Sequence, residues 1–239
     1  MAGTNQPIPR ASDFTAGMVT DPNQSEVTRQ GLFDSLLYAQ AGQAQLSFFS
    51  QQIGQGVTTE PGATVGTPKT GWDTNLQIAN TLPSGKSVQV QGIEVYFWPG
   101  TSAAANTFVQ ANPSVFNAAA SAALSDQIAD VWTFYNSGRL QFQILDKIYI
   151  DEAPLLNFPQ QCGVSGDFAI ATNSATVGSS ALMMSRAIGR PYAIGAPFTL
   201  TATQNFSVNL IWPGLVALPS GFNGRVKVRL DGYVLRATQ

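Results

Sequence analysis

Apolar and polar residues alternate along several short segments, and the clearest alternation closes the chain, in Gly224–Gln239. The aliphatic members are Val226, Val228 and Leu230, and the residues between them are Arg225, Lys227 and Arg229. Because successive residues of a strand point to opposite faces, this pattern predicts a strand with aliphatics inward and a row of cations outward. The outward cations face either solvent or an acidic neighbour, and the pattern does not choose between the two.

Two parity shifts predict bulges. In Lys86–Trp98 the apolar parity changes at Gln91-Gly92, where one extra residue at a glycine would account for it. In the last strand the parity changes at Asp231-Gly232. A bulge there would keep Tyr233 and Leu235 inside and send Arg236 out.

Alternation recurs in 138–159, 166–172 and 196–213, and long Gly/Pro loops such as 54–71 separate the segments. The pattern gives seven or eight strands and no βαβ rhythm. The predicted fold is therefore all-β, an antiparallel sandwich formed by residues 35–239 as one domain.

One helical pattern interrupts the strands, at about 114–136. Alanine runs favour a helix there, Ser125-Asp126 offers a cap, and Asn136 with Gly138 offers a stop. A one-sided stripe of apolar residues predicts a face packed on the core. The stripe consists of Ile128, Val131, Trp132 and Tyr135.

Residues 1–34 are polar, contain Pro7, Pro9 and Pro22, and have few aliphatics. They predict an extended N-terminal arm, ordered only where it lies against something else.

A second unusual segment is the small-residue loop "ATNSATVGSSALMMSRAIGRPYAIG". Met183, Met184, Ala187 and Ile188 stand out in it as apolar. Flexible methionine suits an adaptable contact with another subunit, and folding back on the chain's own core explains it equally well.

Composition adds a constraint on the surface. Hydrophobic residues make up 44% of the 239 residues and charged residues only 11%, with a net charge of −2. So few charges are typical of a surface largely covered by neighbours. No Lys/Arg cluster supports strong direct nucleic-acid binding. Without an apolar leader or a membrane-length apolar run, we expect synthesis in the cytoplasm.

The residue inventory argues against an enzyme. With no histidine and one cysteine, Cys162, histidine-based catalysis and thiolate or imidazole metal sites are excluded. "LPSGKS" lacks the upstream glycine of a phosphate loop, and Asp151-Glu152 point to opposite faces of a strand. Asp126 is explained by a helix N-terminus and Asp130 by a solvated helix face. We predict no catalytic residue, cofactor or metal, and a buried Cys162.

An alternative function is a carbohydrate-binding sandwich of spike or adhesin type, in which surface aromatics stack on sugars. The candidate residues are Trp72, Trp98, Trp132 and Trp212. Apolar neighbours make core or interface burial the preferred explanation for three of them.

Three segments, "KIYIDEAPLLNFPQQ", "PYAIGAPFTLTATQNFSVNLIWPG" and "RVKVRLDGYVLRATQ", carry a resemblance. With the polar arm and the inserted helix, the chain from about residue 30 resembles the jelly-roll major capsid proteins of tailless icosahedral bacteriophages, a group that includes membrane-containing phages. The resemblance implies an eight-stranded jelly roll with one inserted helix.

The resemblance also implies a structural subunit of a virion. Copies would assemble into trimers or pseudo-hexameric capsomers, with other virion proteins or an underlying membrane as further partners. The resemblance implies no catalytic residue. Under this reading the candidate inter-subunit contacts are Arg10, Arg29, Met183, Met184, Ile188, Arg225, Lys227 and Arg229.

Overall fold

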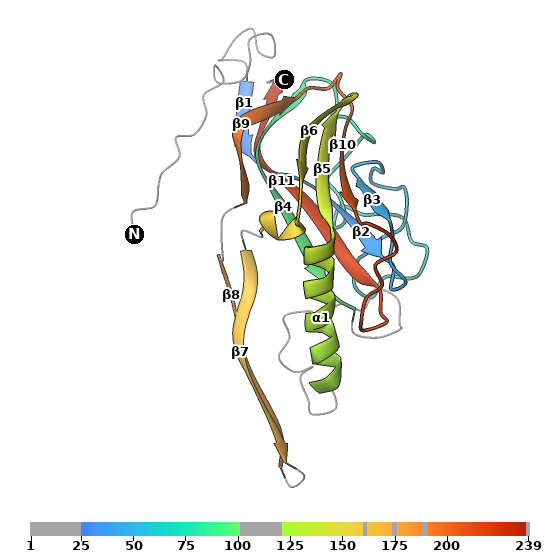
Figure 1. Ribbon diagram of the computed structural model, residues 1–239. Coiled ribbons are helices and arrows are strands. Elements are labelled where there is room, and N and C mark those ends of the chain that lie inside the picture. The colour runs from blue at the N-terminus through green and yellow to red at the C-terminus, as the bar shows by residue number, and fades with distance from the viewer. Residues whose placement is uncertain (1–24, 101–120, 160–161, 174–175, 188–190, 238–239) are drawn as a thin grey trace.

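The computed structural model describes residues 25–100, 121–159, 162–173, 176–187 and 191–237. Two antiparallel sheets pack face to face, a helix lies at one end, and a two-stranded ribbon extends beyond them (Figure 1). The predicted all-β antiparallel sandwich with a helix is confirmed.

The first sheet is built around the C-terminal strand. In spatial order it contains β1 (Ser25–Arg29) and β2 (Leu32–Tyr38) end to end, then β11 (Gly224–Ala237), β4 (Lys86–Trp98) and β9 (Tyr192–Leu200). A bend separates β1 from β2 at Gly31, where a Cβ would come within 2.8 Å of the Arg229 side chain.

The second sheet contains β3 (Gln45–Phe48), β10 (Phe206–Ile211), β5 (Arg139–Ile144) and β6 (Lys147–Glu152), in that order. All of its pairings are antiparallel.

The core lies between the two sheets. Val226, Val228 and Leu230 are buried there as predicted, opposite fully buried residues of the second sheet such as Phe142 and Val208. An aromatic cluster closes one end, with ring pairs that join Tyr38, Phe97, Phe134 and Trp212 at centroid distances of 4.3 to 6.5 Å. Each such side chain contributes about 1.5–3 kcal/mol by leaving water.

One of the two predicted bulges is confirmed. β4 contributes the extra residue, Gln91, opposite the Asp231/Gly232 step of β11. The second bulge, predicted in β11 itself, is wrong, because one register runs unbroken from the β2 pairing into the β1 pairing. The backbones approach so closely here that a Cβ on Gly232 would lie 1.9 Å from the Gln89 carbonyl oxygen.

The unbroken register changes which face the end of β11 uses. Val234 lies in the main core, whereas Tyr233 and Leu235 are buried on the opposite face beside Val27 of β1. Arg236 is exposed, as predicted.

The helix, α1, spans Ser121–Ser137; residues 114–120 of the predicted helix lie outside the described part of the chain. Its buried face is rotated from the prediction. Trp132 is 66% exposed and Phe134 is fully buried, because Phe134 completes the aromatic cluster. Ser125-Asp126 lie within the helix and do not cap it.

Asp130 of this helix is also placed differently from the prediction. It is fully buried instead of solvated, and its Oδ1 accepts a hydrogen bond from the Ser220 amide at 2.9 Å. The helix is thereby joined to the loop before β11. After the helix, Gly138 leaves room for Trp212 and for Leu155 of the short 3-10 helix η5 (Leu155–Asn157).

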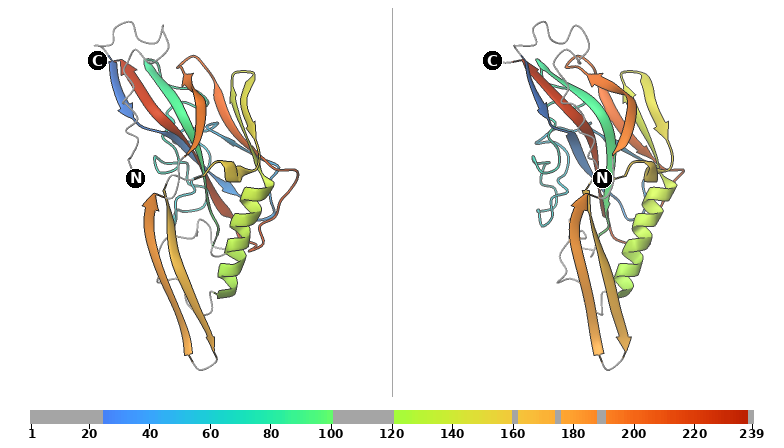
Figure 2. Two further views of the ribbon diagram at one scale, coloured as in Figure 1. Left: turned by 60° about the vertical axis from the view of Figure 1, so that its left-hand side comes forward. Right: turned by 90° about the vertical axis from the view of Figure 1, so that its left-hand side faces the viewer.

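The segment interpreted as a small-residue loop is mostly strand. β7 (Cys162–Asn173) and β8 (Thr176–Ala187) pair along twelve positions as an antiparallel ribbon. Figures 1 and 2 show this ribbon extending away from the sandwich on the same side as α1.

The described part of the predicted arm belongs to the first sheet. β1 and the first residues of β2 pair with β11, and residues 1–24 lie outside the described chain.

Most of the described edge strands of the sandwich are short or irregular. β1 and β3 are five and four residues long, and β6 has an extra residue, Tyr149, opposite β5. β2, with seven residues, continues the edge of β1 in the same register. In β9, the register against β4 jumps from Phe198 to Ala193, and this stretch contains Pro197. Such features weaken an edge strand as a template for further pairing.

Candidate contact surfaces

The outer face of the first sheet is covered by the chain's own loop. This segment, residues 50–85 between β3 and β4, is called the cover loop here. Thr58, Thr59, Lys69 and Asp73 of the cover loop are buried. The predicted row of outward cations therefore lies beneath protein along part of its length.

Arg225 is the most deeply covered of the three cations, with 7% of its surface exposed. Its guanidinium lies 3.6 Å from the ring centre of Trp72 and 4.6 Å from that of Trp98. It donates hydrogen bonds to Thr59 Oγ1 and Ser35 Oγ, both at 3.1 Å. Burial lowers the pKa of Arg225 to about 10, although the Asp73 carboxylate opposes that change.

Lys227 follows on the same face, with its ammonium 4.1 Å from the ring centre of Phe33. Burial lowers the pKa of Lys227 to about 8, and the adjacent cations Arg225 and Arg229 add to this effect against the pull of Glu94. A half-buried amine between two guanidiniums is poorly placed to carry charge.

Arg229 completes the row and has acidic partners within the chain. It contacts Glu94 at 3.4 Å and Asp231 at 3.0 Å, and Asp231 also pairs with Arg29 at 3.2 Å. Glu94 is fully buried and accepts a hydrogen bond from the Tyr96 hydroxyl. Burial and this carboxylate raise the pKa of Tyr96.

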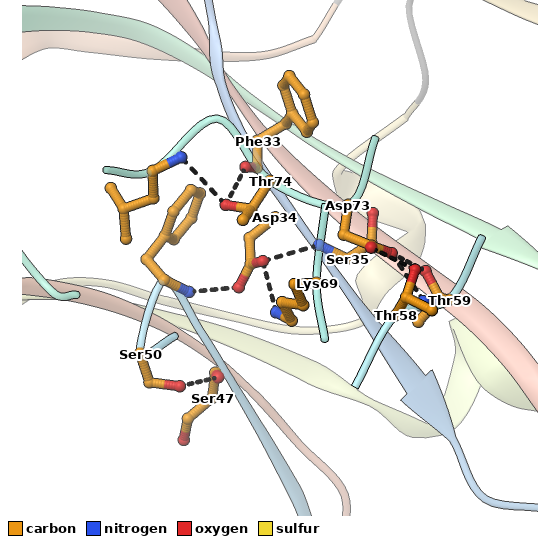
Figure 3. A network of polar contacts seen from close by, with 12 residues as sticks. Phe33, Asp34, Ser35, Ser47, Ser50, Thr58, Thr59, Lys69, Asp73 and Thr74 are labelled. Carbon is orange, nitrogen blue, oxygen red and sulfur yellow. Dashed lines mark hydrogen bonds and ion pairs between the residues drawn. The ribbon is translucent and has the colours of Figure 1, made fainter. Parts of the chain in front are cut away.

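Two buried carboxylates hold the cover loop, as Figure 3 shows. Asp73 accepts four hydrogen bonds, from Thr58 Oγ1, Thr59 Oγ1 and the amides of Thr59 and Thr70, at 2.6 to 3.1 Å. Burial alone would raise the pKa of Asp73, but these hydrogen bonds lower it overall. Asp34 of β2 accepts a bond of 2.7 Å from Lys69 Nζ, and neither side chain has any exposed surface.

The other predicted contact residues are scattered. The Arg29 side chain is 59% exposed at the edge of the first sheet. Met183 and Met184 lie in the ribbon, opposite Gly166 and Ser165. Arg10 and Ile188 lie outside the described residues.

The ribbon register divides its residues into two unlike faces. One face contains Cys162, Val164, Gly166, Phe168, Ile170, Thr172, Val177, Ser179, Ala181, Met183, Ser185 and Ala187. No charged residue is among these twelve, which we call the neutral face. Both charged residues of the ribbon, Asp167 and Arg186, share the opposite face. This distribution is typical of an antiparallel sheet that packs one face against other residues and exposes the other face to solvent.

Exposed apolar side chains also occur on α1, η5 and the β5–β6 hairpin. They are Trp132, Leu145, Ile148, Tyr149 and Leu156, each between 42% and 66% exposed. Single exposed apolar residues are ordinary. These five residues follow one another along the chain, on α1, the β5–β6 hairpin and η5.

The four tryptophans lie in three different environments. Trp72, 39% exposed, and Trp98 contact Arg225, Trp212 lies in the core, and Trp132 is 66% exposed. Among the described acids, Asp151 is ion-paired with Arg139 at 2.8 Å. No group of three or more metal-ligating acids or thiols occurs within the described segments. No helix in those segments has the length and hydropathy to cross a membrane.

Sequence reasoning missed the buried charges of the cover loop. A Gly/Pro/Thr-rich stretch is typical of an exposed loop, and Lys69 and Asp73 look like ordinary surface residues within it. One signal was present: Asp34 has the parity of Leu32 and Leu36, which face the core. An acid at a core-facing position of a strand requires a buried partner.

Comparison of the chain with protein-family models, with curated proteins and with solved structures finds no match.

Proposed function

We propose that the sandwich is a jelly roll and that the protein is a structural coat subunit that assembles into an icosahedral viral capsid. The connectivity of the strands supports the assignment of the sandwich as a jelly roll. Numbered one to eight along the chain, the strands β2, β3, β4, β5, β6, β9, β10 and β11 have the spatial orders 1-8-3-6 and 2-7-4-5. A jelly roll has this arrangement, produced by two interleaved Greek keys, and the fold recurs in capsid and lectin domains.

The two insertions fit this wiring. The segment with α1 connects the third and fourth strands, and the ribbon connects the fifth and sixth. Both lie on the same side of the sandwich (Figure 2). Insertions confined to one end leave the packed faces of the sheets intact.

The projecting ribbon is the observation that carries the assembly function. A two-stranded ribbon is marginal in water by itself, and one neutral face twelve residues in size needs a cover. In a shell, a neighbouring copy would supply that cover. The low charge of the whole chain, 11% of residues, suits a surface that lies mostly against other subunits.

The proposed partners are copies of the chain in trimers or pseudo-hexameric capsomers, other virion proteins and an underlying membrane. The proposed location is the virion. The cations of β11 are engaged within the subunit, which is consistent with a shell that does not bind nucleic acid strongly. The proposed role involves no catalysis.

The test is electron microscopy and sedimentation of the purified full-length chain over a range of concentrations and salts. We expect rings, capsomers or closed shells. A compact monomer under every condition would refute the proposal. Glycan binding by that monomer would favour the carbohydrate-binding alternative.

Variants of the ribbon test whether its neutral face takes part in assembly. Ile170→Asp places a charge on the neutral face, and the matched variant Ala169→Asp places the same charge on the face that already contains Asp167. We expect Ile170→Asp to raise the concentration needed for assembly at least about tenfold, since about 1.4 kcal/mol suffices for that change. Ala169→Asp should have a much smaller effect. Equal effects of the two variants would contradict a role for the neutral face.

A further inference from the structure

The buried pair of Lys69 and Asp34 has properties beyond those of an ordinary ion pair. Its atoms Nζ and Oδ1 lie 2.7 Å apart, and both side chains have no exposed surface. Asp34 sits at a core-facing position of β2, opposite Val228 of β11. Charges confined in such a dry place are strongly disfavoured relative to a neutral pair.

The backbone holds the carboxyl group of Asp34 in one orientation. Its Oδ2 accepts a hydrogen bond from the Phe49 amide at 2.7 Å, and its Oδ1 accepts one from the Ser35 amide at 3.0 Å (Figure 3). Phe49 directly follows β3 and has a φ of 66°, in the left-handed region. Its amide meets Oδ2 as one donor of an oxyanion hole would, while the Ser35 amide holds the other oxygen.

We propose that Lys69 and Asp34 condense into an intramolecular isopeptide bond after folding. The ammonium first transfers a proton to the carboxylate, which leaves a neutral amine beside a neutral acid. The amine lone pair attacks Cγ, and the Phe49 amide stabilises the negative charge that develops on Oδ2. The bond from Cγ to Oδ1 then breaks, Oδ1 leaves as water with two protons from the lysine nitrogen, and one proton stays on the amide.

Burial favours the neutral carboxylic acid that this step requires. Burial raises the pKa of the Asp34 carboxyl, against the opposing effects of Lys69 and the two amides. The fixed approach of Nζ replaces a bimolecular encounter by a pre-oriented contact. No external reagent is needed, because the ion pair and the amide differ by one molecule of water.

The bond would join β2 to the cover loop across 35 positions of sequence. It would fix the cover loop over Arg225 permanently. This inference stands independently of the assembly proposal, because it concerns one folded subunit.

Mass spectrometry of the intact, denatured chain is the first test. We expect wild type to be lighter than its sequence mass by one water. Lys69→Arg keeps the charge but should lose that deficit, and the matched variant Lys147→Arg, at an exposed site, should retain it. A wild-type chain of full mass would overturn the proposal and leave a non-covalent pair, whether or not Lys69→Arg folds.

Peptide mapping provides the second test. Chymotrypsin cuts after Tyr38 and Phe49, which lie between the two residues in sequence, so it separates them unless they are bonded. We expect one linked species with the combined mass of both peptides less one water. The bond should also protect the Lys69–Thr70 peptide from trypsin. Two separate peptides, with cleavage after Lys69, would contradict the bond.

Discussion

At Arg225 a guanidinium is buried with aromatic rings and neutral hydroxyl groups as its closest partners. Trp72 and Trp98 supply negative ring faces, and the Thr59 and Ser35 hydroxyl oxygens accept its hydrogen bonds. Cation–π contacts strengthen when water is excluded. A planar guanidinium stacks on rings in a way that an ammonium cannot, so an arginine suits this position better than a lysine.

Lys227 has no comparable compensation, and its replacement should stabilise the protein. Its pKa falls from the ordinary 10.5 to about 8, so the folded state holds fewer protons than the unfolded state between these pH values. The free energy of unfolding should therefore rise as the pH increases through that window. In Lys227→Met this rise should be absent, and stability at pH 7 should increase by roughly 1–3 kcal/mol.

Urea unfolding of wild type and Lys227→Met at pH 7 and pH 10 measures both effects. Lys147→Met, at an exposed position of β6, is the control and should change little. A loss of stability in Lys227→Met at pH 7 would contradict the argument.

At the scale of elements, the strands follow from local pattern and the covering segments do not. The alternation of Val88 and Val90, and its change of parity before Ile93, predicted β4 and its bulge. Such alternation is a local signal of burial. The face of α1 is set instead by contacts with distant residues. Phe134 and Trp132 both suit a helix, and only the ring cluster of Phe97 and Trp212 selects Phe134.

The second strand of the ribbon and the burial of the cover loop were not predicted, for related reasons. Ser, Gly and Thr in 176–180 look like loop residues, yet they pair with β7 as part of a strand. β-propensity depends on the partner strand, which one segment of sequence does not reveal. The candidate contacts Arg225 and Arg229 were correctly placed on an outward face, but their partners come from other strands and from the cover loop.

Asp73 should be the main anchor of the cover loop. Asp73→Ala removes a carboxylate that accepts four hydrogen bonds, and it leaves the Thr58 and Thr59 hydroxyl groups without that partner. We expect a loss of about 3 kcal/mol in the free energy of unfolding, measured by chemical denaturation. Limited proteolysis near the exposed Val65 should become faster.

The pH dependence of this anchor has a definite sign. Because the pKa of Asp73 lies below its ordinary 3.8 in the fold, its contribution is present above pH 3.8 and is lost as the pH falls further. Asp146→Ala, in an exposed turn, should show neither effect. Unchanged proteolysis in Asp73→Ala would show that other contacts hold the loop.

For the whole molecule, the folded unit extends toward the N-terminus at least to the start of β1. Ser25–Arg29 pairs with the end of β11, and β2 contributes Leu32 and Asp34 to the interior. The sequence indicated an arm to residue 34 because polar residues with prolines dominate that stretch. The alternation in β1 is too short to stand out.

Two truncations test which N-terminal residues the folded domain requires. Removal of residues 1–24 deletes no described contact, and we expect the free energy of unfolding to stay within about 0.5 kcal/mol of wild type. Removal of residues 1–34 deletes β1, Leu32 and Asp34 and should unfold the chain or destabilise it by several kcal/mol. Circular dichroism with thermal melting measures both. Equal stability of the two products would contradict the boundary.

The irregular edges of the two sheets restrict how copies of this chain can grow together. β3 is short, β6 has an extra residue and β9 contains Pro197. These edges therefore offer an incoming strand few regularly spaced backbone groups for hydrogen bonds. Addition of strands at these three edges is therefore disfavoured, and so are fibres in which these edges lengthen without limit. In the proposed assembly, contacts through side surfaces and the ribbon would fix the angle between neighbours, and a fixed angle allows an assembly to close.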